Sequence, residues 1–342
     1  MKRLVDDSRG VRKQALVFVL RHPALAVRLH WWVWMPRLEP GEGITLLEDV
    51  EVRFDRSRQW AARMCVAWAL HCRGSYLAEL GRTDDAIGVW DDVIRRFGDA
   101  DDPALRWWVA RSMIRRALTL HAKGRIEDAI AGLHELEQYV VDETASAALR
   151  ELAASAVRAQ GYFLDELGRT DEAIAANRRL LGRFGGYGEH AIRELVASAL
   201  NHIGDMHLKM ERLDEAMAAH KEVVRRFGRT ARPALREEVA QAALDEGIVL
   251  WRLGRRGEDL AVFEDVLRRF GKFKEPGVRV TLVHALLFKG FALEGLDRAD
   301  EALVVYEELE RFASDADDLI QDDVVEARKR RQELIQDGSS SY

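Results

Sequence analysis

The sequence of 342 residues contains only two cysteines and six prolines. Cys65 and Cys72 lie seven positions apart, which on one helix is two turns or about 10 Å, too far for a disulfide. No second ligand pair near Cys72 and His71 has the spacing of a metal site. We therefore expect structural cysteines in a reducing compartment, with no metal and no cofactor. Scarce proline, together with abundant alanine, leucine, arginine and glutamate, predicts high helix propensity throughout.

The sequence also lacks a long apolar run. Residues 15–20 are apolar, but Arg21 ends this stretch well short of the ~20 residues that a membrane span needs. Asp6 and Asp7 do not fit the basic start of a signal peptide. We therefore expect a cytoplasmic protein without a membrane span.

Motifs that carry enzyme chemistry are missing as well. The chain has no phosphate-binding Gly-Lys-Ser/Thr loop, no Gly-x-Ser-x-Gly and no His-Glu-x-x-His. Its ten histidines are scattered, and the net charge of -6 gives no general case for nucleic-acid binding. We expect no catalytic activity and no nucleic-acid partner.

What the chain does have is internal repetition with a period of 43 or 44 residues. A short acidic segment precedes an alanine at Ala86, Ala129, Ala173, Ala216 and Ala302, and a degenerate copy is centred on Asp259. Eleven residues after each alanine, a second column holds Phe97, Val140, Phe184 and Phe227, with Phe270 in the degenerate copy. A fixed period in this range predicts stacked units, each touching only its neighbours.

Each unit is predicted to be a pair of helices. In the copy over residues 103–141, Pro103 suits the first turn of a helix and Gly124 marks its end. Glu127 and Asp128 then begin a second helix, where acids oppose the positive end of the helix dipole, so capping explains these pairs better than catalysis.

Small residues also recur inside the first helix of each unit, twelve positions before the anchor. This column holds Gly74, Ala117, Gly161, Gly204, Gly247 and Gly290. A glycine within a helix costs about 1 kcal/mol relative to alanine, so we predict that helix backbones approach one another closely at these positions.

This glycine, a leucine three residues later, a helix-breaking Gly-Arg, and an alanine followed by a large residue resemble the tetratricopeptide repeat. The resemblance covers about residues 39–312. The family unit has 34 residues, so about nine more extend the first helix and the loop before it, and glycine replaces the closing proline. HEAT-type pairs fit the period too, but not the Gly/Ala pair twelve apart. The resemblance implies an all-α, right-handed superhelical solenoid of about seven antiparallel helix pairs.

The two ends of the chain depart from the repeat. We predict a basic, tryptophan-rich capping region over 1–38, built from a degenerate first repeat, a closing helix over 313–336 and a flexible tail over 337–342. Residues 1–37 carry eight Lys or Arg against two acids, and residues 297–342 carry fourteen acids against six bases. This asymmetry suggests head-to-tail self-association. Trp31, Trp32 and Trp34 are interpreted as a core cap or a second protein interface; a membrane surface or single-stranded nucleic acid is the alternative.

A binding groove on the exposed side of each first helix is what the resemblance implies for function. The candidate groove residues are Arg111, Arg158, Tyr162, Asn201, Asp205, Trp251 and Phe291. A polar centre beside an apolar, aromatic stretch suits a peptide anchored by apolar side chains, unless half of these residues only cover the extended helix ends. We expect a non-catalytic scaffold or adaptor for a partner protein segment. The alternative is a regulatory or sensor subunit that binds a small ligand or nucleic acid.

An arginine ladder precedes each anchor by 23 residues. Its members are Arg63, Arg106, Arg150, Arg193, Arg236 and Arg279. Two interpretations stay open: each arginine closes off carbonyls at the end of a preceding second helix or pairs with an acid, or the ladder binds phosphate or an acidic peptide.

Overall fold

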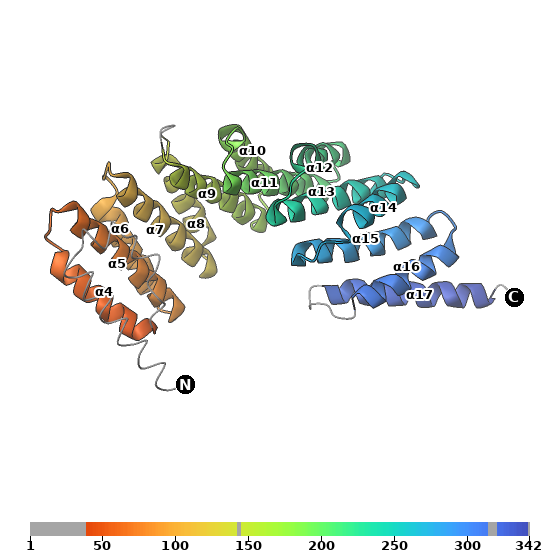
Figure 1. Ribbon diagram of the computed structural model, residues 1–342, viewed down its shortest axis with the longest axis horizontal. Coiled ribbons are helices and arrows are strands. Elements are labelled where there is room, and N and C mark those ends of the chain that lie inside the picture. The colour runs from red at the N-terminus through yellow and green to blue at the C-terminus, as the bar shows by residue number, and fades with distance from the viewer. Residues whose placement is uncertain (1–38, 142–144, 314–319, 341–342) are drawn as a thin grey trace. The chain divides into compact units, whose positions relative to one another are not determined.

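The computed structural model describes residues 39–141, 145–313 and 320–340, which contain fourteen helices and no strand (Figure 1). The chain separates into two compact units, unit 1 (Met1–Arg169) and unit 2 (Thr170–Tyr342). The expected all-α fold of helix pairs is confirmed. The capping region over 1–38, with Trp31, Trp32 and Trp34, lies outside the described residues.

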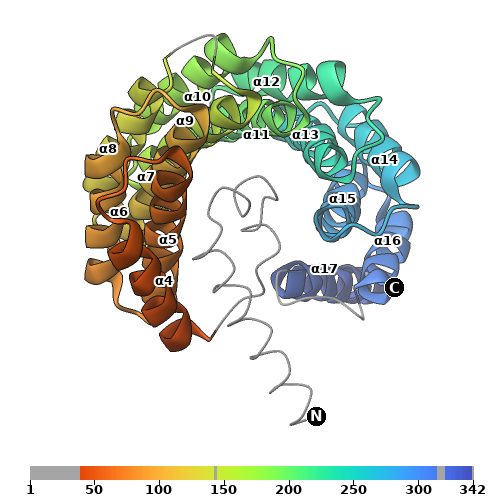
Figure 2. The same cartoon turned by 60° about the vertical axis from the view of Figure 1, so that its left-hand side comes forward.

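Unit 1 alternates long and short helices, which we call A and B. Its helices are α4 (Pro40–Phe54), α5 (Trp60–Glu79), α6 (Thr83–Phe97), α7 (Pro103–Ala122), α8 (Ile126–Tyr139) and α9 (Ala147–Glu166). The A helices α5, α7 and α9 contact one another in series, and the B helices α6 and α8 cover one side of this layer (Figure 2). The other side of the A layer is the surface on which the predicted groove would lie.

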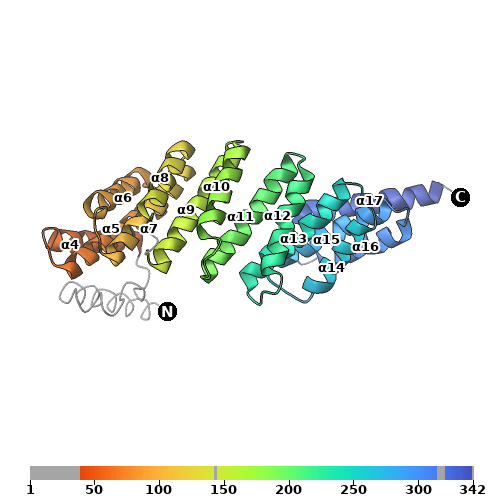
Figure 3. The same cartoon turned by 90° about the horizontal axis from the view of Figure 1, so that it is seen from above.

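Unit 2 repeats the arrangement. Its helices are α10 (Thr170–Phe184), α11 (His190–Lys209), α12 (Leu213–Phe227), α13 (Pro233–Arg252), α14 (Glu258–Phe270), α15 (Pro276–Glu294), α16 (Ala299–Phe312) and α17 (Gln321–Ser340). The A helices α11, α13 and α15 contact in series, and α17 packs on α15 and α16 (Figure 3). The closing helix α17 begins at Gln321 and continues to Ser340, into the predicted tail, because one glycine near a helix end costs only about 1 kcal/mol.

The nine residues by which the unit exceeds the family length lie in the A helices and their entry loops. The A helices α5 and α11 have 20 residues each, whereas the B helices α6 and α12 have 15. Longer A helices give each unit a wider surface on the side away from the B helices.

The glycine column works differently from the prediction. A Cβ at Gly74 would lie 2.5 Å from Nε1 of Trp90, and one at Gly247 would lie 2.5 Å from Cε1 of Phe263. The close neighbour is therefore the large side chain four residues after the anchor on the following B helix, and backbone does not meet backbone. The prediction of close approach was right about the need for glycine and wrong about its cause. A flat ring packed on a helix backbone leaves no room for a methyl group.

The turns between A and B helices each contain a residue in the left-handed conformation. Glycine fills this position in four of the described turns, at Gly81, Gly124, Gly168 and Gly254, with φ between 68° and 74°. In unit 2, Glu211 (φ 57°) and Asp297 (φ 58°) occupy it instead. A residue with a side chain is strained at positive φ, so the backbone of these two turns has a slightly higher conformational energy than a glycine would have there.

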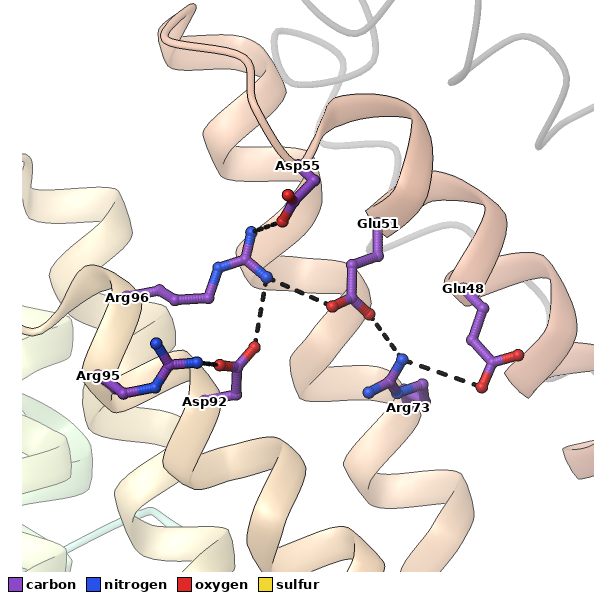
Figure 4. Close-up of polar contacts among 7 residues, drawn as sticks. All are labelled: Glu48, Glu51, Asp55, Arg73, Asp92, Arg95 and Arg96. Atoms are coloured by element: carbon purple, nitrogen blue, oxygen red, sulfur yellow. Dashed lines mark hydrogen bonds and ion pairs between the residues drawn. The ribbon is translucent and has the colours of Figure 1, made fainter.

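The helix α4 stands before the pair α5 and α6 in the chain and packs on α5 as a B helix packs on an A helix. It buries Gly43, Leu47 and Val50 against α5. Ion pairs tie it to both helices of the next pair (Figure 4). The Glu51 carboxylate pairs with the guanidinium of Arg73 on α5, with an N–O distance of 2.6 Å, and with that of Arg96 on α6 at 3.3 Å. Arg96 also pairs with the Asp55 carboxylate at 2.7 Å. The side chains of Arg73, Arg96 and Glu51 are each about one-fifth exposed, so water screens this network only partly.

Three members of the arginine ladder contact rings within their own helix pairs. The guanidinium of Arg63 stacks 5.7 Å from the ring of Phe97, and Arg193 lies 5.6 Å from Phe227. Arg106 stacks on Tyr139 and donates to its carbonyl oxygen at 3.0 Å. These rings end the B helix that follows each arginine. The predicted contact with a preceding B helix is therefore wrong for Arg106, because its side chain points toward the end of its own pair.

Both cysteines are free thiols. Cys65 is buried and Cys72 is half-buried on α5. Burial raises the pKa of each thiol to about 12, so both stay protonated near neutral pH and pack as small apolar groups.

One described helix, α15, is long and apolar enough to cross a membrane by length and composition alone. It packs against α13, α14 and α16, and 56% of its apolar window is buried inside unit 2. These are the properties of a core helix in a helical array.

Candidate functional site

Unit 2 has a cavity of about 650 Å³ on the exposed side of its A helices, lined by residues of α13, α15 and α17 and of the turn after α13. The predicted groove residues Trp251 and Phe291 both line it, together with Leu287. The structure therefore brings together two residues that are 40 positions apart in the sequence.

Aromatic rings form the apolar floor of this cavity. The ring centroids of Trp251 and Phe291 are 6.3 Å apart, and Phe288 lies 5.6 Å from each of them. Tyr306 extends the cluster from α16, 6.4 Å from Phe291. Burial and the adjacent Glu294 raise the pKa of Tyr306 well above its usual value, so its hydroxyl stays protonated and donates to the Glu294 carboxylate. The floor is rigid and suits an apolar side chain.

Acidic residues dominate the rim of the same cavity. Four acids line it, Glu294, Asp322, Asp323 and Glu326, against the two bases Arg256 and Arg330. The bases are engaged within the chain. Arg330 lies 3.2 Å from Glu326 and stacks 5.4 Å from the ring of Phe291, and Arg256 lies 3.2 Å from Asp259. The excess of acids favours a cationic group next to the apolar floor.

The exposed side of the A helices in unit 1 has the opposite character. Arg111 on α7 lies 4.9 Å from the ring of Trp107, and Arg158 on α9 lies 5.0 Å from the ring of Tyr162. Tyr162 is 39% exposed, which is unusual for a large aromatic residue. The predicted groove residues Arg111, Arg158 and Tyr162 therefore lie on two helices in contact and present cations stacked on aromatic faces.

The positive charge on this side of unit 1 affects the pKa of a buried histidine. His71 on α5 is 5% exposed, and its Nδ1 lies 3.0 Å from the hydroxyl oxygen of Ser112. Burial, followed by the positive charges of Arg111 and Arg115, lowers the pKa of His71 to about 3. His71 is thus neutral near physiological pH.

Asn201, predicted for the groove, is buried and links two A helices. Its amide nitrogen donates to the backbone oxygen of Glu238 at 3.0 Å and to its carboxylate at 2.8 Å. This position on α11 therefore joins α11 to α13, and its amide group is not available as an open donor.

Asp205 on α11 lies near a second acid, Asp245, which is on the next A helix, α13. Its side chain is 47% exposed, and that of Asp245 on α13 is 6% exposed. Burial, followed by the negative charge of Asp205, raises the pKa of Asp245 well above its usual value. Among the described residues, Asp205, His220 and Asp245 form the group of side chains that is placed to hold a metal ion.

One member of the arginine ladder lines a smaller cavity of about 240 Å³. Four bases surround this cavity, Arg229, Arg236, Arg269 and Lys272. Arg236 already stacks 3.9 Å from Phe273 and pairs with Glu275, and Arg269 lies 3.2 Å from Asp265. Anion binding by the ladder stays a prediction.

The acidic rim was missed from sequence because it needs α17 to fold back on α15. The excess of acids over residues 297–342 was the available signal, but composition does not say that Asp322 and Glu326 face Phe291. The group of Asp205, His220 and Asp245 was missed because its members come from three helices.

Comparison with known proteins defines the class of this fold. The family model described as "Tetratricopeptide repeat" matches residues 196–231. The match begins six residues after the start of α11, as expected if the extra residues extend the A helix. One unit of the chain thus matches the tetratricopeptide repeat, and no curated protein matches the chain.

Solved structures share the fold at low sequence identity. The apo form of RapI is 11% identical, with a TM-score of 0.64 over 95% of this chain and 86% of that one. BtubC from P. vanneervenii is 14% identical, with a TM-score of 0.55 over 68% of this chain and 89% of that one. The signal transduction ATPase PH0952 from Pyrococcus horikoshii, which has a tetratricopeptide repeat sensor, is 13% identical, with a TM-score of 0.50 over 98% of this chain and 49% of that one.

Proposed function

We propose that the chain is a non-catalytic, cytoplasmic scaffold that binds a segment of a partner protein on the exposed side of its A helices. The observation that carries this proposal is the cavity of unit 2, with the apolar floor of Trp251, Leu287 and Phe291 under an acidic rim. A concave apolar site with a few convergent charges is the usual form of a binding site.

The chemistry of this cavity favours a particular kind of segment. An aliphatic or aromatic side chain would rest on the rings, and a lysine or arginine next to it would meet Asp322 and Glu326. In unit 1, the stacked cations Arg111 and Arg158 would favour an acidic segment by the same reasoning. A partner with both kinds of segment would use both units.

Fluorescence anisotropy with two model peptides tests the site in unit 2. A labelled peptide that alternates leucine and lysine is expected to bind, and a peptide that alternates leucine and glutamate is not. Phe291→Ala should weaken binding of the first peptide at least tenfold, which corresponds to about 1.4 kcal/mol. Asp322→Lys, on an exposed residue, should weaken it about three- to tenfold. Glu308→Lys makes the same charge change on the exposed side of α16, outside the cavity lining, and should have no effect.

Affinity capture from the native cell extends the test to the true partner. A protein retained by the wild-type chain should be lost from the Phe291→Ala bait, with circular dichroism showing that the variant is folded. Equal retention by both baits would contradict the proposal for this cavity.

A second function, that of a sensor or regulatory subunit, is favoured by the sensor that PH0952 carries on the same fold. Such a chain would change shape around a small ligand or nucleic acid. A large RNA or DNA affinity that falls steeply with salt would support this function over the scaffold. Head-to-tail self-association stays a prediction, which light scattering tests as a size that grows at low salt.

A further inference from the structure

His220 on α12 is a fully buried polar residue whose two ring nitrogens lack a hydrogen-bond partner among the described residues. Its exposed fraction is 0%, and its ring packs against Gly204 of α11. Neither Nδ1 nor Nε2 makes a hydrogen bond. A buried polar group without a partner costs about 1–3 kcal/mol, so the position calls for an explanation.

In other repeats, the polar side chains at the same position make hydrogen bonds. Four residues after the anchor, Trp90 donates from Nε1 to the carbonyl of His71 at 3.2 Å. Asn177 donates from its amide to the carbonyl of Ala173 at 2.9 Å, and Tyr306 donates to Glu294. The fold therefore permits a polar group here to be paired, and His220 is the exception.

Two carboxylates flank the imidazole at a distance too long for direct hydrogen bonds. Nε2 of His220 lies 3.9 Å from Oδ1 of Asp205, and Nδ1 lies 3.9 Å from Oδ2 of Asp245. One repeat earlier, the equivalent pair, Asn177 and His202, meets directly at 3.1 Å. The gap around His220 is thus not imposed by the spacing of the helices.

One ion would bind a single ring nitrogen of His220; Nδ1 is the nitrogen that faces the buried Asp245, whereas Asp205 faces Nε2 and would have to move toward the ion. One ligand atom from each of Asp205, His220 and Asp245 lies within 4.8 Å of the other two. Bonds of about 2.0–2.2 Å from zinc to nitrogen or oxygen place two ligands of a tetrahedral ion about 3.3 Å apart. A small inward rotation of the partly exposed Asp205 side chain would bring its carboxylate within bonding distance of the ion.

A chain of hydrogen bonds holds the buried carboxylate in position. The amide nitrogen of Gln241 donates to both oxygens of Asp245, at 3.0 and 3.1 Å, and the hydroxyl of Thr281 donates to the amide oxygen of Gln241 at 3.4 Å. Metal ligands are commonly oriented by such outer partners.

We propose that Asp205, His220 and Asp245 bind one divalent transition-metal ion. An imidazole nitrogen with two carboxylate oxygens is a donor set that suits zinc, manganese or iron. An ion of charge +2 would balance the negative charge of the two carboxylates in this buried position. Only Asp205 is substantially exposed, so the ion would enter from the open side of the A helices, where a water molecule would fill the remaining coordination position.

Calorimetric titration of the full chain with Zn²⁺, after removal of metals by a chelator, tests this proposal. One Zn²⁺ per chain is expected. His220→Phe should abolish binding, and it should fold because Phe263 fills the equivalent position over Gly247. Asp205→Asn should weaken binding at least tenfold, and Gln241→Leu about tenfold through loss of the outer hydrogen bond. His284→Gln is the matched control, since His284 pairs with Asp323 at 3.0 Å outside this group.

Co²⁺ gives an independent readout, because visible absorption bands of the bound ion report its ligands. Such bands should form with the wild-type chain and be lost in Asp205→Asn. The proposal is overturned if Zn²⁺, Mn²⁺ and Co²⁺ all fail to bind, which would leave only a proton shared by the three residues. Equal Zn²⁺ binding by wild type and folded Asp205→Asn would overturn it as well, whatever the fate of His220→Phe.

Discussion

Units 1 and 2 are built from the same repeat, yet the exposed sides of their A helices carry opposite charge. In unit 1, Arg111 and Arg115 help to lower the pKa of the buried His71. In unit 2, Asp205 helps to raise the pKa of the buried Asp245. Two residues at the same depth in equivalent layers thus experience fields of opposite sign.

The difference separates the columns of the repeat that the two units share from those that they do not. The glycine that accommodates a ring and the arginine that stacks on the end of helix B recur in both units. The position two residues before the glycine does not. It holds Cys72, Arg115 and Ala159 in unit 1 and His202, Asp245 and Phe288 in unit 2. The framework can thus stay fixed while the exposed side changes its partner.

The largest predicted effect concerns the shared framework. Gly74→Ala in unit 1 and Gly247→Ala in unit 2 should each destabilise their own unit by about 3 kcal/mol, because the new methyl group would overlap a buried ring. Hydrogen exchange followed by mass spectrometry measures each unit separately. Gly88→Ala is the control on α6, where nothing lies within 4 Å, and it should stabilise by about 1 kcal/mol. Similar effects at Gly74 and Gly88 would refute the role of the ring.

The second prediction sharpens the contrast in charge. His71 has its pKa lowered from 6.5 to about 3 on folding, so the unfolded chain binds the proton more tightly. Its contribution to stability is complete above pH 6.5 and falls as the pH drops toward 3. At pH 5 the loss should reach about 2 kcal/mol, at about 1.4 kcal/mol per pKa unit.

Urea unfolding at pH 7 and pH 5 checks this prediction. His220 also has a lowered pKa, of about 4, so the wild-type chain alone is not decisive. His71→Phe should lose about 2 kcal/mol less than wild type between the two pH values. The same pH dependence in both chains would show that His71 is not responsible.

The third prediction asks whether the arginine ladder is structural in both units. Arg106→Leu and Arg236→Leu should each destabilise by about 1–2 kcal/mol, since each removes a cation stacked on a ring and a hydrogen bond to a carbonyl. Thermal unfolding measures the effect. Unchanged stability together with lost partner binding would instead assign the ladder to the partner.

The smallest prediction concerns the turns, where the units also differ. In the described residues of unit 1 the left-handed position is always glycine, whereas unit 2 has Glu211 and Asp297 there. Asp297→Gly should stabilise unit 2 by about 0.5–1 kcal/mol by relieving the strain. A urea midpoint at or below that of wild type would contradict this reason.

The sequence alone predicted the framework well, because each helix pair depends on neighbours only one repeat away. The period, the small-residue column around Gly204 and the B helix that begins near Asp84 all follow from local patterns. The identity of the residue that meets the glycine did not follow. It requires knowing that the side chains of Trp90 and Phe263 pack against the A helix of their own helix pair.

The candidate sites were harder to predict for the same physical reason. Trp251 and Phe291 were found through the repeat register, which places them on one side of the A helices. Asp322 reaches them only through the packing of α17, which belongs to no pair. His220 offered one signal in retrospect, a histidine in a column that otherwise holds Trp90, Leu133, Asn177, Phe263 and Tyr306.

The position of α17 at the end of the array has a consequence for the cavity. It contributes three of the four carboxylates around the cavity, Asp322, Asp323 and Glu326, and among the described helices it packs mainly on α15 and α16. Replacing this single terminal helix would change the charged residues beside the aromatic floor without repacking any earlier helix. For the proposed site, the kind of group accepted beside the aromatic floor would therefore depend on this one terminal helix.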